Sequence, residues 1–366
     1  QQDMEQFYAR ALAQAALGRY PQALLDNARA RGLASARQAS LRLLDFRLQQ
    51  IALTLEAETP ERALDLLTQL WPAVRDHPAQ ASEWHALNGL AFYRAQQMKE
   101  AILELKTALQ QKQQEPVTLL STLQCGRLLM TLGNLYADLS LHREAERYYQ
   151  DALEQMTGLN DPNSQAIIRA NMARLYIDMA HPARANQLLD TLLATPGLSP
   201  RYRAIVLGYQ AMVFNAQGEW RAAWLSLEEA QAIYDGLGTP QAAARLAEIR
   251  AKTLMGRGEK LLALQLLMAQ SGPLSMNGRA MQARLLADLG RYPEAYGAMA
   301  RYMQSYKQHF NQTLSQHAAA FQVERDLARS EASNRALQLE NENKRRQLLY
   351  QQSARNYQLL LLVLLA

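Results

Sequence analysis

A pair of small residues twelve positions apart recurs along most of the chain. The second member is always an alanine, at Ala23, Ala63, Ala101, Ala145, Ala185, Ala223, Ala263 and Ala295. The residues twelve positions before them are Ala11, Ile51, Gly89, Gly133, Ala173, Ala211, Ala251 and Ala283, of which only Ile51 is neither Gly nor Ala. Because two antiparallel helices approach closely only where side chains are small, each pair predicts one helical hairpin.

The predicted turns agree with this spacing. The hexapeptides Gly18–Ala23, GRYPQA, and Gly290–Ala295, GRYPEA, are almost identical, and Gly218-Glu219 and Gly258-Glu259 occupy the same place in their hairpins. Gly suits the end of a helix, and Pro suits the first turn of the next. Further proline-containing breaks occur at Thr59-Pro60, Asp161-Pro162, Thr195-Pro196 and Thr239-Pro240. The pattern predicts about sixteen helices over residues 3–305.

The stretch Leu132–Ala152, LGNLYADLSLHREAERYYQDA, is the fullest version of the unit. It places Gly133 and Tyr136 on one helix, and Ala145, Tyr149 and Ala152 on the next. This arrangement resembles the tetratricopeptide repeat (TPR). The resemblance implies an all-α protein, a right-handed superhelical TPR solenoid of about eight helical hairpins with a concave inner face.

Composition excludes several classes of function. The net charge of +5 comes without a basic cluster interleaved with aromatic residues, so an Arg-rich solvated surface is favoured and no nucleic acid partner is expected. The single cysteine, Cys125, permits no internal disulfide, and the six histidines show no ligand spacing. Gly256–Lys260 lacks the full spacing of a phosphate-binding loop. We therefore expect no catalytic site, no metal and no cofactor in this chain.

A long polar helix is predicted after the repeats. From Met299 to Tyr357 the sequence contains no Gly and no Pro. A coiled-coil register can be drawn through Val323, Leu327, Ser330, Asn334, Leu337, Asn341, Lys344 and Leu348. Half of these positions are polar, which is typical of a marginal seam that sets register. We expect a TPR solenoid over 1–305 and a signalling helix over 306–356, with a homodimer through 321–355; a solitary solvated helix is the alternative.

The chain ends in an apolar segment. Leu359–Ala366 is LLLLVLLA, whereas a membrane-spanning helix needs about 20 apolar residues. We interpret residues 357–366 as the start of a transmembrane helix that is cut short at residue 366. The chain begins at Gln1 without Met, for which a removed signal peptide is one explanation. A basic cluster such as Lys344–Arg346 next to a membrane span usually marks the cytoplasmic side of the membrane. Long translocated domains do not follow this rule. We expect the protein to be anchored in the inner membrane, with residues 1–356 in the periplasm.

The resemblance also implies a binding surface. In TPR proteins the first helix of each hairpin lines the concave groove, and the exposed positions of that helix come after its small residue. Here the candidate ligand- or partner-binding residues are Tyr93, Arg94, Asn134, Asp138, Arg174, Asp178, Asn215 and Lys252. Such side chains suit a protein, a peptide or a small polar ligand, and solvated helix residues are the alternative. A clamp for a C-terminal carboxylate is not expected, because Met130, Ile205 and Tyr209 stand where its cations belong.

The order of parts suggests a function. Repeats, a polar helix and an apolar segment resemble the N-terminal sensory region of bacterial membrane-bound TPR signalling proteins, which often end in a diguanylate cyclase or a histidine kinase. Phe321–Arg355 is similar in character to their linker helices. We expect a sensor that passes a conformational signal to an output domain beyond residue 366, with a diguanylate cyclase favoured. The alternative is a membrane-anchored scaffold without an output domain; a cytoplasmic transcription regulator is disfavoured by the apolar end.

Overall fold

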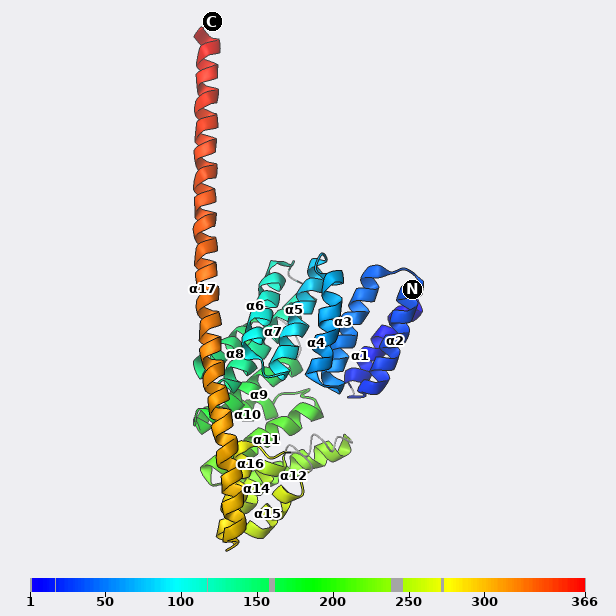
Figure 1. Cartoon of the computed structure of the whole chain (residues 1–366), viewed down its shortest axis with the longest axis vertical. Helices are drawn as coiled ribbons and strands as arrows, with labels where there is room; N and C mark the ends of the chain where they lie inside the picture. Colours follow the sequence, from blue (N-terminus) through cyan, green and yellow to red (C-terminus); the bar gives the residue numbers. More distant parts are fainter. Residues whose placement is uncertain are drawn as a thin grey trace. The chain divides into compact units, whose positions relative to one another are not determined.

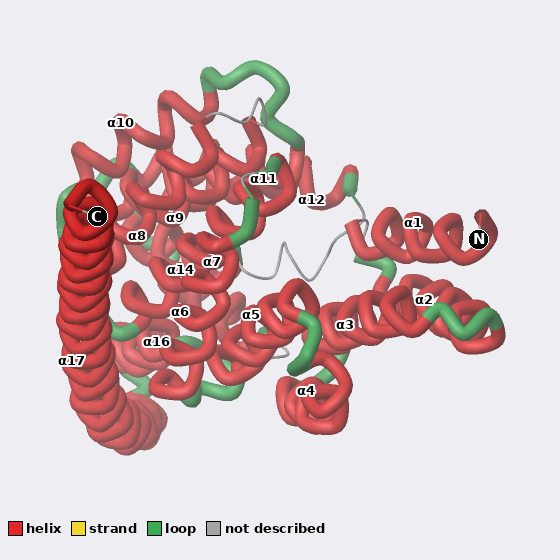
Figure 2. Tube along the Cα trace, turned by 90° about the horizontal axis from the view of Figure 1, so that it is seen from above, coloured by secondary structure: helices red, strands yellow, loops and turns green. Residues whose placement is uncertain are grey.

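The computed structural model describes residues 2–16, 18–116, 118–157, 162–237, 246–270 and 273–365. These residues form helices, drawn red in Figure 2, joined by loops and turns, with no strand among them. In chain order the helices are α1 (Gln2–Ala16), α2 (Tyr20–Ala36), α3 (Ser40–Ala57), α4 (Pro60–Val74), α5 (Pro78–Arg94), α6 (Met98–Gln114), α7 (Leu119–Asp138), α8 (His142–Thr157), α9 (Pro162–Asp178), α10 (Pro182–Leu193), α11 (Pro200–Gln217), α12 (Trp220–Gly236), α14 (Ala247–Gly256), α15 (Lys260–Met268), α16 (Met276–Asp288) and α17 (Tyr292–Leu365). The described helices confirm the all-α prediction.

The helices pair into antiparallel hairpins that follow one another in chain order, from the blue α1 and α2 to the yellow α14–α16 (Figure 1). Each second helix packs against the first helix of its own hairpin and against the first helix of the next. From α3 onward each first helix also contacts the next first helix. Among the described helices, no comparable contact joins one second helix to another. The first helices therefore lie on the inner side of a TPR-like solenoid.

The small residues lie where the sequence predicts. All eight repeat alanines are at most 8% exposed. A β-carbon added to Gly89 would lie 2.9 Å from the backbone nitrogen of Leu105, so these two helices approach closely because Gly89 has no side chain. Ile51, the exception in the pattern, is 2% exposed and belongs to the same core as Leu67. The predicted unit at this position therefore forms in spite of the larger residue.

The turns inside the hairpins share one backbone feature. The residue five positions before the repeat alanine has a positive φ at Gly18, Gln96, Ser140, Ala180, Gly218, Gly258 and Gly290. The backbone N–H groups of this residue and of the residue after it donate to carbonyls at the end of the preceding helix. In the hairpin of α7 and α8, the N–H of Ser140 donates to the carbonyl of Ala137, and the N–H of Leu141 donates to the carbonyl of Tyr136. The glycines were predicted. The three residues with a β-carbon adopt the same left-handed conformation at a conformational cost.

The chain divides into two compact units, residues 1–316 and 317–366. In the first unit α17 supplies the second helix of the last hairpin, since Ala295 and Ala298 share a core with Leu286 of α16. The amide of Gln316 on α17 donates to the carbonyl of Gln96 at 3.0 Å. The first unit thus includes α17 to Gln316, whereas the sequence-based boundary was placed after residue 305.

The second unit is the remainder of α17. In the predicted coiled-coil register Val323 is 3% exposed, whereas Leu337 and Leu348 are 54% and 58% exposed. None of the helices in the described residues contains an apolar stretch of the length needed to span a lipid bilayer. The side chains of Leu359–Ala366, on which the predicted transmembrane segment rests, lie outside the described residues.

Candidate partner-binding site

Five of the eight predicted groove residues lie together on three successive first helices. Tyr93 comes from the end of α5, Asn134 and Asp138 from α7, and Arg174 and Asp178 from α9. Because the first helices lie on the inner side of the solenoid, these side chains lie on its inner surface. They are half-buried or exposed, which leaves them accessible to a partner.

Asp138 connects the three helices. The hydroxyl of Tyr93 donates a hydrogen bond of 2.5 Å to Asp138 Oδ2. On the other side Arg174 Nη2 lies 3.5 Å from Asp138 Oδ1, and Arg174 Nη1 lies 4.0 Å from Asp178 Oδ2. One guanidinium therefore stands between two carboxylates, and the formal charge of these three groups is −1.

Asn134 is held from two directions. Its Oδ1 accepts a hydrogen bond of 2.8 Å from the hydroxyl of Tyr149 and one of 2.9 Å from the amide of Asn171. Two donors on one oxygen fix the plane of the side chain and direct its NH₂ group away from them. Within the described residues, no hydrogen bond uses that NH₂ group. It is therefore left to donate to a bound molecule.

We call the set Tyr93, Asn134, Asp138, Tyr149, Asn171, Arg174 and Asp178 the inner polar cluster. Burial, with a smaller contribution from Asp138, raises the pKa of Tyr93 far above its ordinary value. Burial likewise raises the pKa of Tyr149, and Arg174 opposes the rise. Burial also raises the pKa of Asp178, again opposed by Arg174. The two tyrosines thus remain protonated donors at neutral pH.

Three predicted residues lie apart from the cluster. Arg94 turns toward α3, where it donates to the carbonyl of Leu55 and to the carboxylate of Glu56. Lys252 is exposed on α14, outside the cluster. The prediction that Asn215 is an exposed groove residue is wrong, because it is only 3% exposed.

Asn215 is buried because α11 and α14 pack directly against each other. Its amide donates to the carbonyl of Ile249 at 3.3 Å, and its Oδ1 accepts from the hydroxyl of Thr253 at 3.0 Å. The side chain thus satisfies polar groups between two hairpins. Asn215 is therefore a structural residue.

The sequence-based prediction did not assign Tyr149 or Asn171 to the binding surface. The ring of Tyr149 belongs to the predicted packing of α7 against α8 and is fully buried. One signal in the sequence was available, because a buried tyrosine hydroxyl normally needs a hydrogen-bond partner. Asn171 lies 37 positions from Asn134, and only the stacking of α7 and α9 brings the two amides together.

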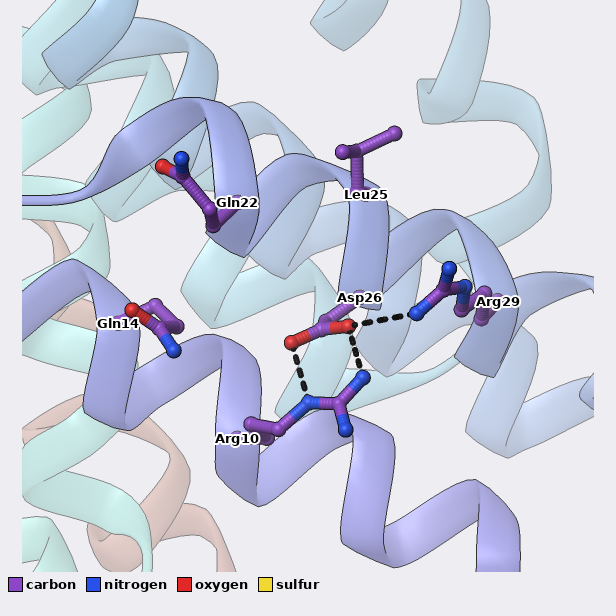
Figure 3. Close-up of a pocket in the computed structure, with 6 residues that line it drawn as sticks. All are labelled: Arg10, Gln14, Gln22, Leu25, Asp26 and Arg29. Atoms are coloured by element: carbon purple, nitrogen blue, oxygen red, sulfur yellow. Dashed lines mark hydrogen bonds and ion pairs between the residues drawn. The ribbon is translucent and has the colours of Figure 1, made fainter.

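A separate shallow pocket of about 320 Å³ lies between α1 and α2 (Figure 3). Its charged groups already bind one another: Arg10 Nε and Nη2 lie 2.6 and 2.5 Å from the two oxygens of Asp26, and Arg29 lies 3.4 Å away. The hydrogen bond from Arg10 lowers the pKa of Asp26. Gln14, Gln22 and Leu25 complete the rim. The ion pair of Arg10 with Asp26 joins α1 to α2 within the first hairpin, and the formal charge of Arg10, Asp26 and Arg29 together is +1.

The part of the chain that the structure describes contains no group of three or more His, Cys, Asp or Glu side chains positioned to hold a metal ion. Cys125 is buried, and burial raises the pKa of its thiol, so this thiol is poorly suited to act as a nucleophile. The inner polar cluster is the stronger candidate for function.

Comparisons with known proteins identify the fold. No protein-family model and no curated protein matches the sequence. Among solved structures, the apo form of RapI is 9% identical and is matched over 89% of this chain and 98% of its own, with a TM-score of 0.59. The apo form of the quorum sensor NprR from B. thuringiensis is 11% identical over 83% of this chain and 98% of its own, with a TM-score of 0.53.

Yeast Tom70 is 13% identical over 83% of this chain and 61% of its own, with a TM-score of 0.50. Identities this low show the fold and leave the function to be argued from the site. The chain therefore has a TPR-like fold.

Proposed function

We propose that the inner polar cluster binds an extended, uncharged or basic peptide segment of a partner protein. The observation that carries this proposal is the amide of Asn134, fixed by Tyr149 and Asn171 with its NH₂ group left to donate. A peptide carbonyl is a matching acceptor. The formal charge of −1 on Asp138, Arg174 and Asp178 disfavours an acidic segment or a C-terminal carboxylate.

Labelled peptide libraries with amidated C-termini test this proposal by fluorescence polarisation. Bound peptides are expected to carry a neutral or positive charge and to bind without a free carboxylate. Asn134→Ala should raise the Kd about tenfold, the effect of losing one hydrogen bond of about 1.4 kcal/mol. Lys252→Ala, an exposed change outside the cluster, is the control and should leave the Kd unchanged. Selection of acidic peptides that need a free carboxylate would contradict the proposal.

We further propose that the chain is the sensory region of a membrane-bound signalling protein. The order of the parts supports this reading: a binding solenoid, one helix that runs from Tyr292 to Leu365, and the apolar Leu359–Ala366. NprR, which shares the fold, is a quorum sensor, so the fold is compatible with sensing. In this proposal residues 357–366 begin a transmembrane helix in the inner membrane, and the repeats face the periplasm.

The proposed mechanism is mechanical. Each repeat contacts mainly its neighbours, so a peptide that bridges α5, α7 and α9 changes the small rotations between hairpins, and these changes add along the solenoid. α17 belongs to the last hairpin and carries the change toward an output domain beyond residue 366, a diguanylate cyclase first and a histidine kinase second. Insertion of four residues after Ser330 in the full-length protein should abolish the response. An unchanged response would contradict this mechanism.

A membrane-anchored scaffold without an output domain is the second candidate, favoured by the same TPR-like surface. The coding sequence past Ala366 distinguishes the two. A completed apolar span followed by a cyclase or kinase signature supports the sensor, and a stop codon soon after the span supports the scaffold. Protease digestion of the repeats in intact spheroplasts tests the proposed periplasmic location, since cytoplasmic repeats would be protected.

A further inference from the structure

The second helices carry side chains that contact the next hairpin. One position after the repeat alanine, Glu146 of α8 accepts a hydrogen bond of 2.6 Å from the hydroxyl of Tyr176 on α9. At the same position of α12, the ring of Trp224 lies 5.4 Å from the guanidinium of Arg250 on α14. The equivalent residue of α17 is Tyr296, and it is 80% exposed.

The position eight residues after the repeat alanine repeats this contrast. On α4 it is Trp71, whose ring centroid lies 4.5 Å from that of Trp84 on α5. On α17 it is Met303, which is 55% exposed. The face that covers the next first helix in the earlier hairpins is therefore exposed to solvent in the last one.

The exposed face of α17 has a regular pattern. Its apolar side chains, which we call the terminal stripe, are Tyr292, Tyr296, Met299, Met303, Tyr306, Phe310 and Leu314, each between 44% and 80% exposed. From Tyr292 to Phe310 their spacing alternates between four and three residues. This alternation is the pattern of a coiled-coil seam, in which each apolar residue packs into a hole on a facing helix.

The length of the terminal stripe indicates what covers it. In the other hairpins the second helix ends at most thirteen residues after its repeat alanine, as at Ala36 and Gln114. Phe310 and Leu314 lie fifteen and nineteen residues after Ala295, beyond the reach of an ordinary hairpin junction. A longer helix is required, and α17 itself, with 74 residues, is such a helix.

We propose that two copies of this chain associate through their terminal stripes, with the two α17 helices parallel and in register. A heptad seam complements an identical seam, because the holes on one helix are formed by the same residues that enter the holes of the other. In the parallel arrangement each residue of the terminal stripe meets the same residue of the second copy. This proposal does not depend on what the inner polar cluster binds.

The proposed seam differs from the register predicted between Val323 and Leu348. Val323 follows Phe310 by thirteen residues, which places it about 220° around a helix that turns about 100° per residue. The two seams are therefore distinguishable by mutation.

Sedimentation of the full chain in mild detergent, which covers the apolar end, tests the dimer over a wide range of concentration. The chain is expected to be a dimer, and Tyr306→Glu is expected to be a monomer with unchanged helicity, because Tyr306 is 47% exposed in one chain. Leu337→Glu is the matched control at an exposed leucine of the other register and should remain a dimer. A monomeric wild-type chain, or a dimer that only Leu337→Glu dissociates, would overturn the proposal.

Disulfide trapping tests the orientation. Cys125 is the single cysteine, so Cys125→Ser gives a background without thiols. Oxidation of Phe310→Cys in that background should link two copies at the same residue. Gln308→Cys, two residues away on the other side of the helix, should remain unlinked. If Phe310→Cys stays unlinked in a dimeric sample, the parallel register is wrong.

Discussion

Gly133 lies directly against the aromatic ring of Tyr149: a β-carbon at Gly133 would be 2.6 Å from both Cδ1 and Cε1 of the ring. The hydroxyl of the same ring donates to Asn134 Oδ1 at 2.8 Å on the inner surface. One side chain thus occupies the closest approach of α7 and α8 and also orients the amide that we propose for binding. Packing in this hairpin and the geometry of the inner polar cluster are coupled.

Gly133→Ala should destabilise the fold. The ring of Tyr149 has to move by several tenths of an ångström to admit the new methyl group, at a cost of about 1–3 kcal/mol. Gly32→Ala is the matched control, because a β-carbon at Gly32 meets nothing within 4 Å and its φ is not positive. That change should stabilise α2 by about 0.5–1 kcal/mol. Urea denaturation measures both, and equal effects of the two changes would contradict the close approach.

Ala180→Gly should stabilise the fold by about 1 kcal/mol. Ala180 has a φ of 55°, a left-handed conformation that is costly for a residue with a β-carbon and free of that cost for Gly. Ala28→Gly, at an exposed position inside α2, should instead destabilise by about 1 kcal/mol. The two melting temperatures should therefore shift in opposite directions. A lower melting temperature for Ala180→Gly would show that this turn carries no such strain.

Asn215→Ala should lower stability and leave peptide binding unchanged. The change removes two hydrogen bonds between α11 and α14, one from the amide of Asn215 to the carbonyl of Ile249 and one from the hydroxyl of Thr253 to Asn215 Oδ1, at a cost of about 1–3 kcal/mol. Asn134→Ala should act mainly on the Kd for a bound peptide. Parallel measurement of melting temperature and Kd separates the two asparagines. Loss of peptide affinity in a folded Asn215→Ala protein would return Asn215 to the binding surface.

Stability should fall at alkaline pH, in part through Tyr176. Burial and the hydrogen bond to Glu146 raise the pKa of Tyr176 to about 12. In the unfolded chain a tyrosine has a pKa of about 10, so the folded state holds this proton more tightly. The stabilisation is complete below about pH 10 and is lost as the pH rises toward the folded pKa.

Tyr176→Phe should therefore flatten the decline of unfolding free energy between about pH 10 and 12, by at most about 1.4 kcal/mol per pH unit. Tyr350→Phe, at a ring that is 76% exposed, is the matched control. Urea denaturation at a series of pH values gives both slopes. A slope that is unchanged by Tyr176→Phe would show that this proton does not contribute.

The sequence alone determined the hairpins and their turns, because both depend on local requirements that residue size and backbone freedom reveal. The alanines from Ala23 to Ala295 fit a helix crossing wherever they occur, and Gly18 and Gly290 fit a left-handed turn. The sequence also placed Asn134, Asp138 and Arg174 on inner helices, since the resemblance to TPR proteins fixes which helix of each hairpin faces inward.

Only the tertiary structure decided which of these side chains meet and which are covered. Tyr93 and Asp138 are 45 residues apart, and the rotation from one hairpin to the next decides whether they touch. The same stacking buries Asn215 against α14. Along α17 the sequence shows an apolar spacing, but the exposure of Tyr296 and Met303 depends on what packs there. Contacts between distant segments are set by the geometry of the assembled solenoid, which no local pattern encodes.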